Sequence, residues 1–216
     1  MSRRKAGCLT GTADKILENH KKYLERIKFY RSFGYDLERE REFILDRAIP
    51  ISGNILEIGT GKGHFALALA KRGFKFTSID ISEEEQGVAK LNMKYYGLED
   101  QVSFGVEDAQ ALSFPDHNFD LIFSINVFHH LEKPDAVLNE TVRLLRPAGR
   151  IVLSDFNSKG LKIINECHIR EGRVHDHFKH DLCHAKDFFA AKGFEVTEFQ
   201  SETQAVVIAE ENRAIR

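Results

Sequence analysis

Hydrophobic and polar positions follow two different patterns along this chain. Between residues 12 and 49, apolar residues recur at helical spacing among many lysines, arginines and glutamates, and Phe33-Gly34-Tyr35 interrupts the pattern. From residue 54 onward, short β-branched apolar runs alternate with helical stretches, which is typical of a parallel sheet whose strands are joined by crossover helices. The pattern therefore predicts a pair of N-terminal helices followed by one α/β domain.

Seven apolar runs are predicted as strands. The first five alternate with helices, whereas only a few polar residues separate the last two, which favours an antiparallel hairpin at one edge of the sheet. We therefore expect a seven-stranded, mostly parallel α/β sheet with a C-terminal antiparallel hairpin. The predicted strands are 54–58, 75–79, 102–106, 119–124, 150–154, 194–199 and 204–209.

Several residues mark where the predicted helices begin and end. Residues 82–85, Ser-Glu-Glu-Glu, have the form of a capping box, and the helix that follows is expected to end near Gly97. Pro134 fits the first turn of another helix, where its missing N–H is not needed. Residues 147–149, Pro-Ala-Gly, are expected to end that helix just before the fifth strand.

Composition limits the class of protein and its partners. The 216 residues, 42% of them hydrophobic, are enough to bury one substantial core. The net charge of -2 gives no overall attraction to nucleic acid, and no basic cluster stands out beyond residues 3–5, so we expect no nucleic-acid partner. No stretch has the apolar length of a secretory signal or a membrane span, and the odd number of cysteines, three, favours reduced thiols. These features predict a cytoplasmic protein without a membrane span.

The main candidate for ligand binding is the glycine-rich stretch at residues 57–63, Glu-Ile-Gly-Thr-Gly-Lys-Gly. It ends a predicted strand and enters a predicted helix, which places bare backbone at the carboxyl edge of the sheet, where open α/β folds bind ligands. Asp80 ends the next strand, roughly 20 residues after the first glycine, where an acid accepts hydrogen bonds from a ribose diol. This arrangement indicates a ligand that contains a ribose.

Three other interpretations fit the glycine turn less well. The dinucleotide fingerprint G-x-G-x-x-G needs glycine at position 64, where this chain has His64. A P-loop needs glycine at position 56 and serine or threonine after Lys62, where the chain has Leu56 and Gly63. A turn with a purely structural role does not account for the acidic residues at positions 57 and 80, or for a third acidic residue later in the chain.

The spacing E-x-G-x-G-x-G, followed by an acid at the end of the second strand, resembles the S-adenosylmethionine site of class I methyltransferases. Residues 105–156 are similar throughout to the small-molecule group of these enzymes that includes the ubiquinone/menaquinone C-methyltransferases. With residues 53–97, the resemblance covers roughly half of the chain. It implies a Rossmann-like, doubly wound fold, S-adenosylmethionine as cofactor with S-adenosylhomocysteine as product, and a small-molecule methyl acceptor.

The same resemblance implies roles for individual residues in cofactor binding. The glycine turn would lie against the methionine part of the cofactor, and acids or small residues after the second and third strands would contact the ribose and the adenine. The implied residues are Glu57 beneath the turn, Gly59, Thr60, Gly61 and Gly63 within it, Asp80 for the ribose, Ile81, Asp108 and Ala109 for the adenine, and Asn126 for the methionine end.

Residues that follow the fourth and fifth strands are candidates for catalysis. Methyl transfer from a sulfonium is an in-line displacement, so positioning dominates, and a histidine can add a factor by deprotonating the acceptor. His129 and His130 are the candidate bases, although packing is the more common role of such a pair. Asp155 is expected either to line the acceptor pocket or to cap the next helix.

The expected organisation is an N-terminal helical lid, residues 1–50, on a methyltransferase domain, residues 51–216. In the resembled family such helices close over the cofactor, and Tyr30, Phe33 and Tyr35 would either complete that closure or fix the helices to the sheet. A variable acceptor-side insertion is expected at residues 156–185. The motifs specify neither the acceptor nor an oligomeric state.

Half of the ten histidines fall within residues 166–189. On a helix, His177, His180 and His184 would share one face beside Cys183, but the spacing matches no standard zinc pattern, so we expect no metal. We expect the fold to withstand a chelator, and His175 to contribute to turnover with the acceptor rather than to cofactor binding.

Two further functions remain as alternatives. One is a non-catalytic S-adenosylmethionine-binding module with a regulatory role, which would form no S-adenosylhomocysteine. The other is a nicotinamide-dependent oxidoreductase, which His64 disfavours.

Overall fold

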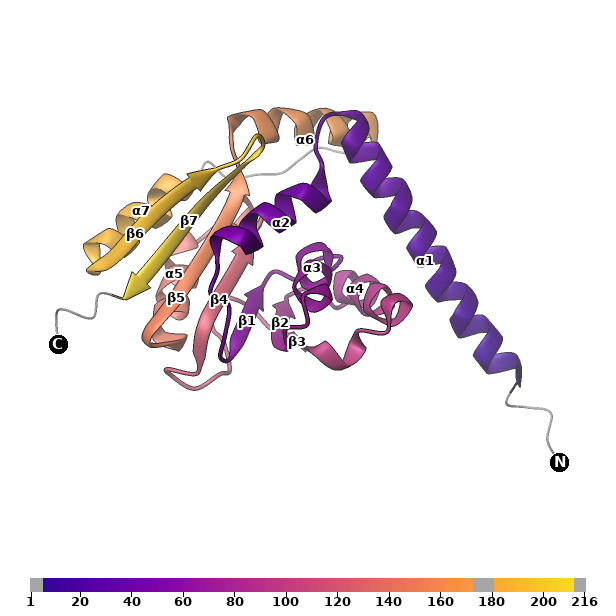
Figure 1. Cartoon of the computed structure of the whole chain (residues 1–216), viewed down its shortest axis with the longest axis horizontal. Helices are drawn as coiled ribbons and strands as arrows, with labels where there is room; N and C mark the ends of the chain where they lie inside the picture. Colours follow the sequence, from indigo (N-terminus) through magenta and orange to yellow (C-terminus); the bar gives the residue numbers. More distant parts are fainter. Residues whose placement is uncertain (1–5, 173–180, 212–216) are drawn as a thin grey trace.

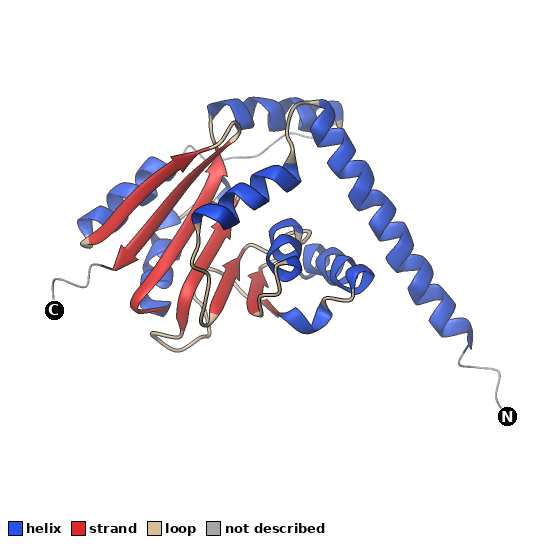
Figure 2. Cartoon of the chain, in the orientation of Figure 1, coloured by secondary structure: helices blue, strands red, loops and turns tan. Residues whose placement is uncertain are grey.

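The computed structural model describes residues 6–172 and 181–211, and these form a seven-stranded sheet with helices on both faces (Figures 1 and 2). The strand order is β3-β2-β1-β4-β5-β7-β6, in which the first five strands are parallel and β7 runs antiparallel between β5 and β6. The predicted fold class is confirmed. The strands are β1 Ile55–Ile58, β2 Phe76–Asp80, β3 Val102–Val106, β4 Phe119–Ile125, β5 Leu145–Phe156, β6 Phe194–Gln200 and β7 Gln204–Glu211.

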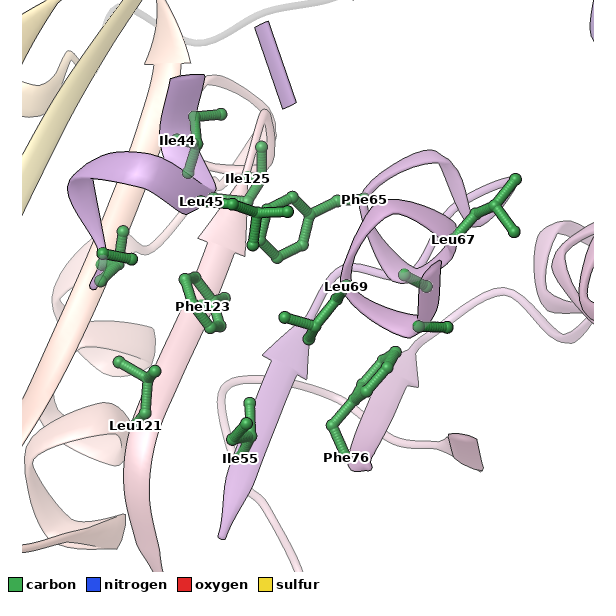
Figure 3. Packing of buried hydrophobic residues seen from close by; sticks show 14 of the residues in the cluster. Ile44, Leu45, Ile55, Phe65, Leu67, Leu69, Phe76, Leu121, Phe123 and Ile125 are labelled. Carbon is green, nitrogen blue, oxygen red and sulfur yellow. The ribbon is translucent and has the colours of Figure 1, made fainter. Parts of the chain in front are cut away.

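Helices cover both faces because the strands bury side chains on both sides. One face is covered by α2, α3 and α4, with α1 packed on α4, and Phe65 of α3 lies against Phe123 of β4 at a ring distance of 5.0 Å (Figure 3). The other face packs against α5 and α7, whose Leu138 and Phe189 are fully buried. The α-helices are α1 Ala6–Ser32, α2 Leu37–Arg47, α3 His64–Lys71, α4 Glu83–Tyr96, α5 Pro134–Leu144, α6 Ser158–Arg170 and α7 Leu182–Ala191.

The predicted boundary between α5 and β5 is wrong. The helix ends at Leu144 and the strand starts at Leu145, five positions before the predicted start at residue 150. Pro147 accounts for the difference, because its ring excludes the residue before it, Arg146, from the helical conformation. The three residues expected to end the helix instead lie within β5, where Ala148 has a φ of 64°.

The two predicted N-terminal helices are confirmed. The chain leaves the helical conformation between α1 and α2 at Phe33-Gly34-Tyr35, as predicted. Asp36 caps α2 by accepting a hydrogen bond from the N–H of Arg39 at 3.2 Å. The cap predicted for α4 is also present, because the hydroxyl of Ser82 accepts from the N–H of Glu85 at 3.2 Å.

Across the described parts of the chain, no helix is both long and apolar enough to span a membrane.

A buried chain of hydrogen bonds supports the glycine turn from below. Gln86 of α4 donates to the hydroxyl of Thr60 at 3.2 Å, Thr60 and Ser78 are joined at 2.6 Å, and Ser78 donates to Glu57 at 2.5 Å. Glu57 is 1% exposed, and burial raises the pKa of its carboxyl to about 8, partly opposed by the Ser78 hydrogen bond and by Arg41. Because this chain links β1, β2 and α4, it fixes the turn in place.

We expect the substitution Glu57→Gln to change how stability depends on pH. The folded protein holds a proton on Glu57 up to about pH 8, whereas the unfolded chain releases it near its ordinary pKa of 4.5. Folding stability from this group is therefore complete below about pH 4.5 and is lost as the pH rises towards about 8. Glutamine carries no such proton, so urea unfolding should show the variant gaining stability relative to wild type over that range. Glu83→Gln, at an exposed position, is the control, and parallel pH curves for wild type and Glu57→Gln would contradict the assignment.

Candidate functional site

A cavity of about 660 Å³ lies at the carboxyl edge of the sheet, where β1, β2, β3 and β4 end. The size is within the ordinary range for pockets that hold small molecules and cofactors. Its walls come from the glycine turn after β1, the ends of β2 and β3, and the segment from Asn126 to Val137 that follows β4. This edge is where open α/β sheets bind ligands.

A second cavity of about 660 Å³ lies at the opposite edge of the sheet, but its charged groups already serve the fold. Asp120 accepts from the N–H of Asn54 at 2.6 Å and pairs with Arg146 at 2.8 Å. Arg150 donates to the carbonyl oxygen of Ala48 at 2.8 Å. We therefore assign no ligand to this cavity.

The glycine turn needs glycine for two physical reasons. Gly59, Gly61 and Gly63 have φ angles of 87°, 48° and 79°, in the left-handed region that other residues rarely adopt. A Cβ on Gly59 would lie 2.1 Å from Val127, and one on Gly63 would lie 2.7 Å from Ala89. Gly61 has no such neighbour within 4 Å, so its backbone is open to the cavity.

Asp80 ties the glycine turn to the end of β2. One carboxylate oxygen accepts from the N–H of Gly61 at 2.7 Å, and the other accepts from the N–H of Ser82 at 2.8 Å. Each carboxylate oxygen has a second lone pair, so Asp80 retains the capacity to accept from a ligand in the cavity that it lines. Ile81 follows it on the wall and is 71% exposed, which gives the cavity an apolar surface.

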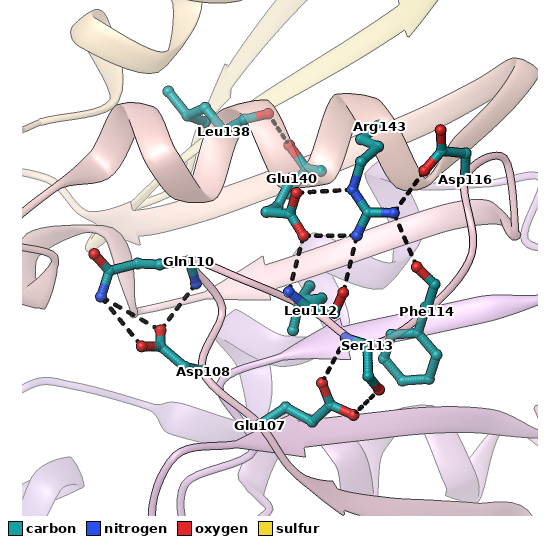
Figure 4. A network of polar contacts seen from close by, with 11 residues as sticks. Glu107, Asp108, Gln110, Leu112, Ser113, Phe114, Asp116, Leu138, Glu140 and Arg143 are labelled. Atoms are coloured by element: carbon teal, nitrogen blue, oxygen red, sulfur yellow. Dashed lines mark hydrogen bonds and ion pairs between the residues drawn. The ribbon is translucent and has the colours of Figure 1, made fainter.

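The loop after β3 is held in one shape by a network of polar contacts (Figure 4). Arg143 of α5 donates to the carbonyl oxygens of Leu112 and Phe114 at 3.0 and 2.9 Å, and Glu140 accepts from the N–H of Leu112 at 2.9 Å. Asp108, which lines the cavity, accepts from the N–H of Gln110 at 2.9 Å. This wall is therefore ordered by the protein itself.

The cavity carries an excess of negative charge. Five acidic residues line it, whereas Lys133 is the one lysine or arginine that the described residues contribute to its wall. Such a wall attracts a cationic ligand and repels a pyrophosphate. The acidic residues are Asp80, Glu85, Glu107, Asp108 and Glu132.

The structure brings most of the residues implied by the family resemblance to this cavity. Its wall contains Gly59, Gly61, Asp80, Ile81, Asp108, Ala109, Asn126 and His130. Behind the wall lie Glu57, Thr60, Gly63 and His129, which are not among the lining residues. Sequence reasoning missed Glu107, Gln110, Val127 and Leu131, although each of these residues neighbours a predicted one.

Asn126 lies just after β4 in a conformation that is unusual for a residue other than glycine. Its φ is 58°, and its N–H donates to the carbonyl oxygen of Ser154 at 2.7 Å. Its side-chain nitrogen lies 3.4 Å from the hydroxyl of Tyr35, while its side-chain oxygen is buried without a hydrogen-bond partner. An unpartnered buried oxygen beside a cavity requires an explanation.

His129 is paired with Asp155, at the carboxyl ends of β4 and β5. The ring Nδ1 of His129 lies 2.6 Å from one carboxylate oxygen, and the backbone N–H of His129 donates to the other at 2.9 Å. Both side chains are buried. The alternative that Asp155 caps the next helix is wrong, because Asn157 accepts from the N–H groups at the start of α6.

The aromatic residues at the break between α1 and α2 are packed into the body of the protein. Tyr35 is 1% exposed and lies against Phe156 at a ring distance of 5.5 Å. Tyr30 and Phe33 pack against the same cluster, which includes Ile163 of α6. Packing therefore fixes the helix pair to the carboxyl edge of the sheet.

Part of the histidine-rich segment lies outside the described residues, including His175, His177 and His180. Within the described parts, Cys167 of α6 is buried, and His184 at the start of α7 lies 2.6 Å from Asp135. No group of three His, Cys, Asp or Glu side chains in residues 6–172 and 181–211 is arranged to hold a metal ion.

Comparisons with known proteins point to one family. A family model described as a methyltransferase domain matches residues 56–153. Methyltransferase GfsG from Streptomyces halstedii is 34% identical over 125 residues, which are 57% of this chain and 45% of that protein. The ubiquinone biosynthesis O-methyltransferase from Dechloromonas aromatica is 33% identical over 125 residues, which are 57% of this chain and 53% of that protein. The chain thus spans about half the length of these relatives.

A solved structure extends the likeness to the fold. A SAM-dependent methyltransferase from Aquifex aeolicus superposes with a TM-score of 0.61 at 20% identity, covering 80% of this chain and 89% of that chain. Identity at this level shows the fold alone, whereas the family model and the curated relatives match the sequence. These matches support a class I S-adenosylmethionine-dependent methyltransferase, with residues 56–153 as the part that matches the methyltransferase domain.

Proposed function

We propose that this protein binds S-adenosylmethionine in the cavity at the carboxyl edge and transfers its methyl group to an oxygen atom of a small-molecule acceptor. The observation that carries this proposal is the acidic cavity around the open glycine turn, with Asp80 at the end of β2. S-adenosylmethionine has a sulfonium and a ribose diol but no phosphate, so an acidic wall suits it and disfavours a dinucleotide.

The residues present fit this cofactor at both of its ends. Asp80 has acceptor capacity left for the ribose hydroxyls, and the exposed face of Ile81 offers a surface for the adenine. Asp108 and Ala109 line the same cavity and are proposed to contact the adenine edge. At the other end, Gly61 leaves space over the backbone, and the side chain of Asn126 has an unsatisfied polar atom.

The bound cofactor would supply an electrophilic methyl group, and the chain's own residues would align the acceptor and manage its proton. Asp155 is placed to keep the proton of His129 on Nδ1, which leaves Nε2 in the basic form. His130, whose ring centre lies 3.9 Å from that of His129, is the histidine on the cavity wall, so an acceptor hydroxyl would give its proton to this histidine pair and become the nucleophile. Relatives named O-methyltransferases support oxygen as the proposed acceptor atom, and a relative named an N-methyltransferase makes nitrogen the second candidate.

The N-terminal residues 1–50 are proposed to close the methionine end of the cavity, because Tyr35 reaches Asn126 on its wall. His175 stays a candidate for acceptor recognition.

We place the reaction in the cytoplasm, in keeping with the odd number of cysteines, and expect no nucleic-acid acceptor. We propose no metal requirement.

Ligand-dependent melting tests the proposed cofactor. S-adenosylhomocysteine at 100 times its Kd should add about 2.7 kcal/mol to the stability and raise the melting temperature by about 5 to 10 °C, whereas NAD should not. Incubation with S-adenosylmethionine and a panel of hydroxylated small molecules should then yield S-adenosylhomocysteine. Equal shifts with both ligands would rule out the proposed cofactor.

The substitution Asp80→Asn should weaken binding of S-adenosylhomocysteine by about 1.5 to 3 kcal/mol, the usual contribution of hydrogen bonds to a charged group. Asparagine keeps the size of the side chain but removes its charge and one acceptor oxygen, so it cannot accept from Gly61, Ser82 and the ribose hydroxyls together. Titration calorimetry would measure the loss. Asp100→Asn, at an exposed position, is the control, and wild-type affinity in Asp80→Asn would remove this residue from the ribose role.

The substitutions His129→Gln and Asp155→Asn should each lower kcat at least about 100-fold with an acceptor found in the panel, because the first removes one of the two candidate histidines and the second removes the carboxylate that orients it. The affinity for S-adenosylhomocysteine should be unchanged in both variants. Asp187→Asn, on the exposed face of α7, is the control. A kcat that stays close to the wild-type value in both variants would leave the pair with a structural role only.

A further inference from the structure

A third cavity, of about 180 Å³, lies between α1, the glycine turn and α4. None of the residues that line it also lines the cavity at the carboxyl edge, so the two spaces are separate. A cavity of about 150 Å³ is enough for a molecule the size of benzene. This third cavity therefore has room for a small polar group with a few attached atoms.

Hydrogen bonds join the elements around this third cavity. The side-chain nitrogen of Asn19 in α1 donates to the side-chain oxygen of Asn92 in α4 at 2.8 Å. The side-chain nitrogen of Asn92 then donates to the carbonyl oxygen of Lys62 in the glycine turn at 2.9 Å. Because Asn92 is only 1% exposed, these bonds are shielded from water, and they hold the walls in place before a ligand binds.

Three cations line this cavity. Lys22 and Arg26 lie one turn apart on α1, and Lys62 follows Gly61 in the glycine turn. Among the residues of the wall that the structure describes there is no aspartate or glutamate. A concave wall with charge of one sign attracts a ligand of the opposite sign, so this cavity suits an anion.

Each cation has an acidic neighbour that lies outside the cavity. The ion pairs measure 2.7 Å for Lys22, 2.8 Å for Arg26 and 3.7 Å for Lys62. The pairs of both lysines are exposed, and exposed ion pairs contribute little to stability. The guanidinium of Arg26 has five N–H donors, more than one carboxylate can use. The three side chains can therefore also serve a ligand.

Positive charge dominates at this place even with those acidic neighbours present. His64 lines the same cavity, and burial is the largest cause that lowers its pKa to about 3. Arg41, Lys62 and Arg26 lower the pKa of His64 further. The imidazole is therefore neutral near pH 7, and the nearby cations lack a balancing negative charge at its ring.

We propose that this cavity binds the phosphate group of a small molecule, with Lys62 and Arg26 as the main contacts and Lys22 adding charge from the exposed side. A phosphate group carries a charge of about −1.5 to −2 near pH 7 and three acceptor oxygens, so it can engage several cations at once. The group belongs either to inorganic phosphate or to a phosphate monoester. The inference goes beyond the proposed function, because it concerns a separate cavity.

A phosphate in this cavity would connect α1 with the glycine turn. Lys62 is the residue next to Gly61, whose N–H donates to Asp80. A bound anion would therefore favour the arrangement of the turn that the cavity at the carboxyl edge also needs. Because coupling between two binding sites is reciprocal, S-adenosylhomocysteine should leave the affinity for phosphate unchanged or raise it.

Titration calorimetry of the wild-type protein at constant ionic strength tests the site without any cofactor. Inorganic phosphate, glycerol 3-phosphate or both should bind saturably, whereas glycerol should not. Equal affinities for the two anions would identify inorganic phosphate as a sufficient ligand, and tighter binding of glycerol 3-phosphate would identify a phosphate monoester. Absence of saturable binding by both anions would overturn the inference.

The same titration with saturating S-adenosylhomocysteine tests whether the two cavities are separate sites. Simultaneous binding supports the inference, whereas displacement of phosphate by S-adenosylhomocysteine would overturn it by showing that both occupy one site. A lack of binding by S-adenosylhomocysteine would overturn the proposed function and leave the phosphate measurement standing.

Variants test the contacts. Lys62→Gln and Arg26→Gln should each weaken phosphate binding about 10- to 150-fold, the range for hydrogen bonds to a charged group. Lys28→Gln, at an exposed position of α1, is the matched control and should bind as wild type does. Melting temperatures without ligand show whether each variant folds, and if Arg26→Gln does not, Lys62→Gln decides, since its ion pair is exposed. Wild-type phosphate affinity in folded Lys62→Gln would overturn the inference.

Discussion

The carboxylate of Asp80 is the interaction on which the site depends. Three glycines with positive φ give the turn after β1 a shape that other residues rarely adopt, and such a segment is held only by specific contacts. Asp80 provides them by accepting from the N–H groups of Gly61 and Ser82, so the turn and the end of β2 become one rigid unit. The same side chain faces the cavity, and the order that it imposes is therefore already present before a ligand binds.

The charges on the wall of the cavity are mostly of one sign. Five acidic residues line it, whereas Lys133 is the one lysine or arginine among the described residues of the wall. The proposed cofactor carries a sulfonium and no phosphate, so this wall favours it over a dinucleotide. The same wall disfavours an orientation that would bring the carboxylate of the proposed cofactor against Asp80 and Asp108.

The sequence predicts the parts of this structure that depend on local patterns. Alternating apolar runs determine the order of helices and strands, and the glycine turn with Asp80 is readable because all its members lie within residues 57–80. The predicted end of α5 differs from the structure by a few residues because Pro147 acts on the residue before it. The cluster around Tyr35 was not predictable, since its partners Asn126 and Gln204 lie 91 and 169 positions away and meet only when the sheet is assembled.

The packing of α2 limits how the N-terminal helices can move as a lid. Leu37, Ile44 and Leu45 of this helix are almost completely buried, and at about 1.5 to 3 kcal/mol for each side chain their exposure would cost about 5 to 9 kcal/mol. That cost approaches the total stability of a typical domain, so lifting the whole helix during each turnover is unfavourable. A smaller rearrangement at the break between α1 and α2 disturbs fewer buried groups. The break also contains Tyr35, which contacts Asn126 on the cavity wall, so movement there would couple access to the site with the orientation of a group that faces the ligand.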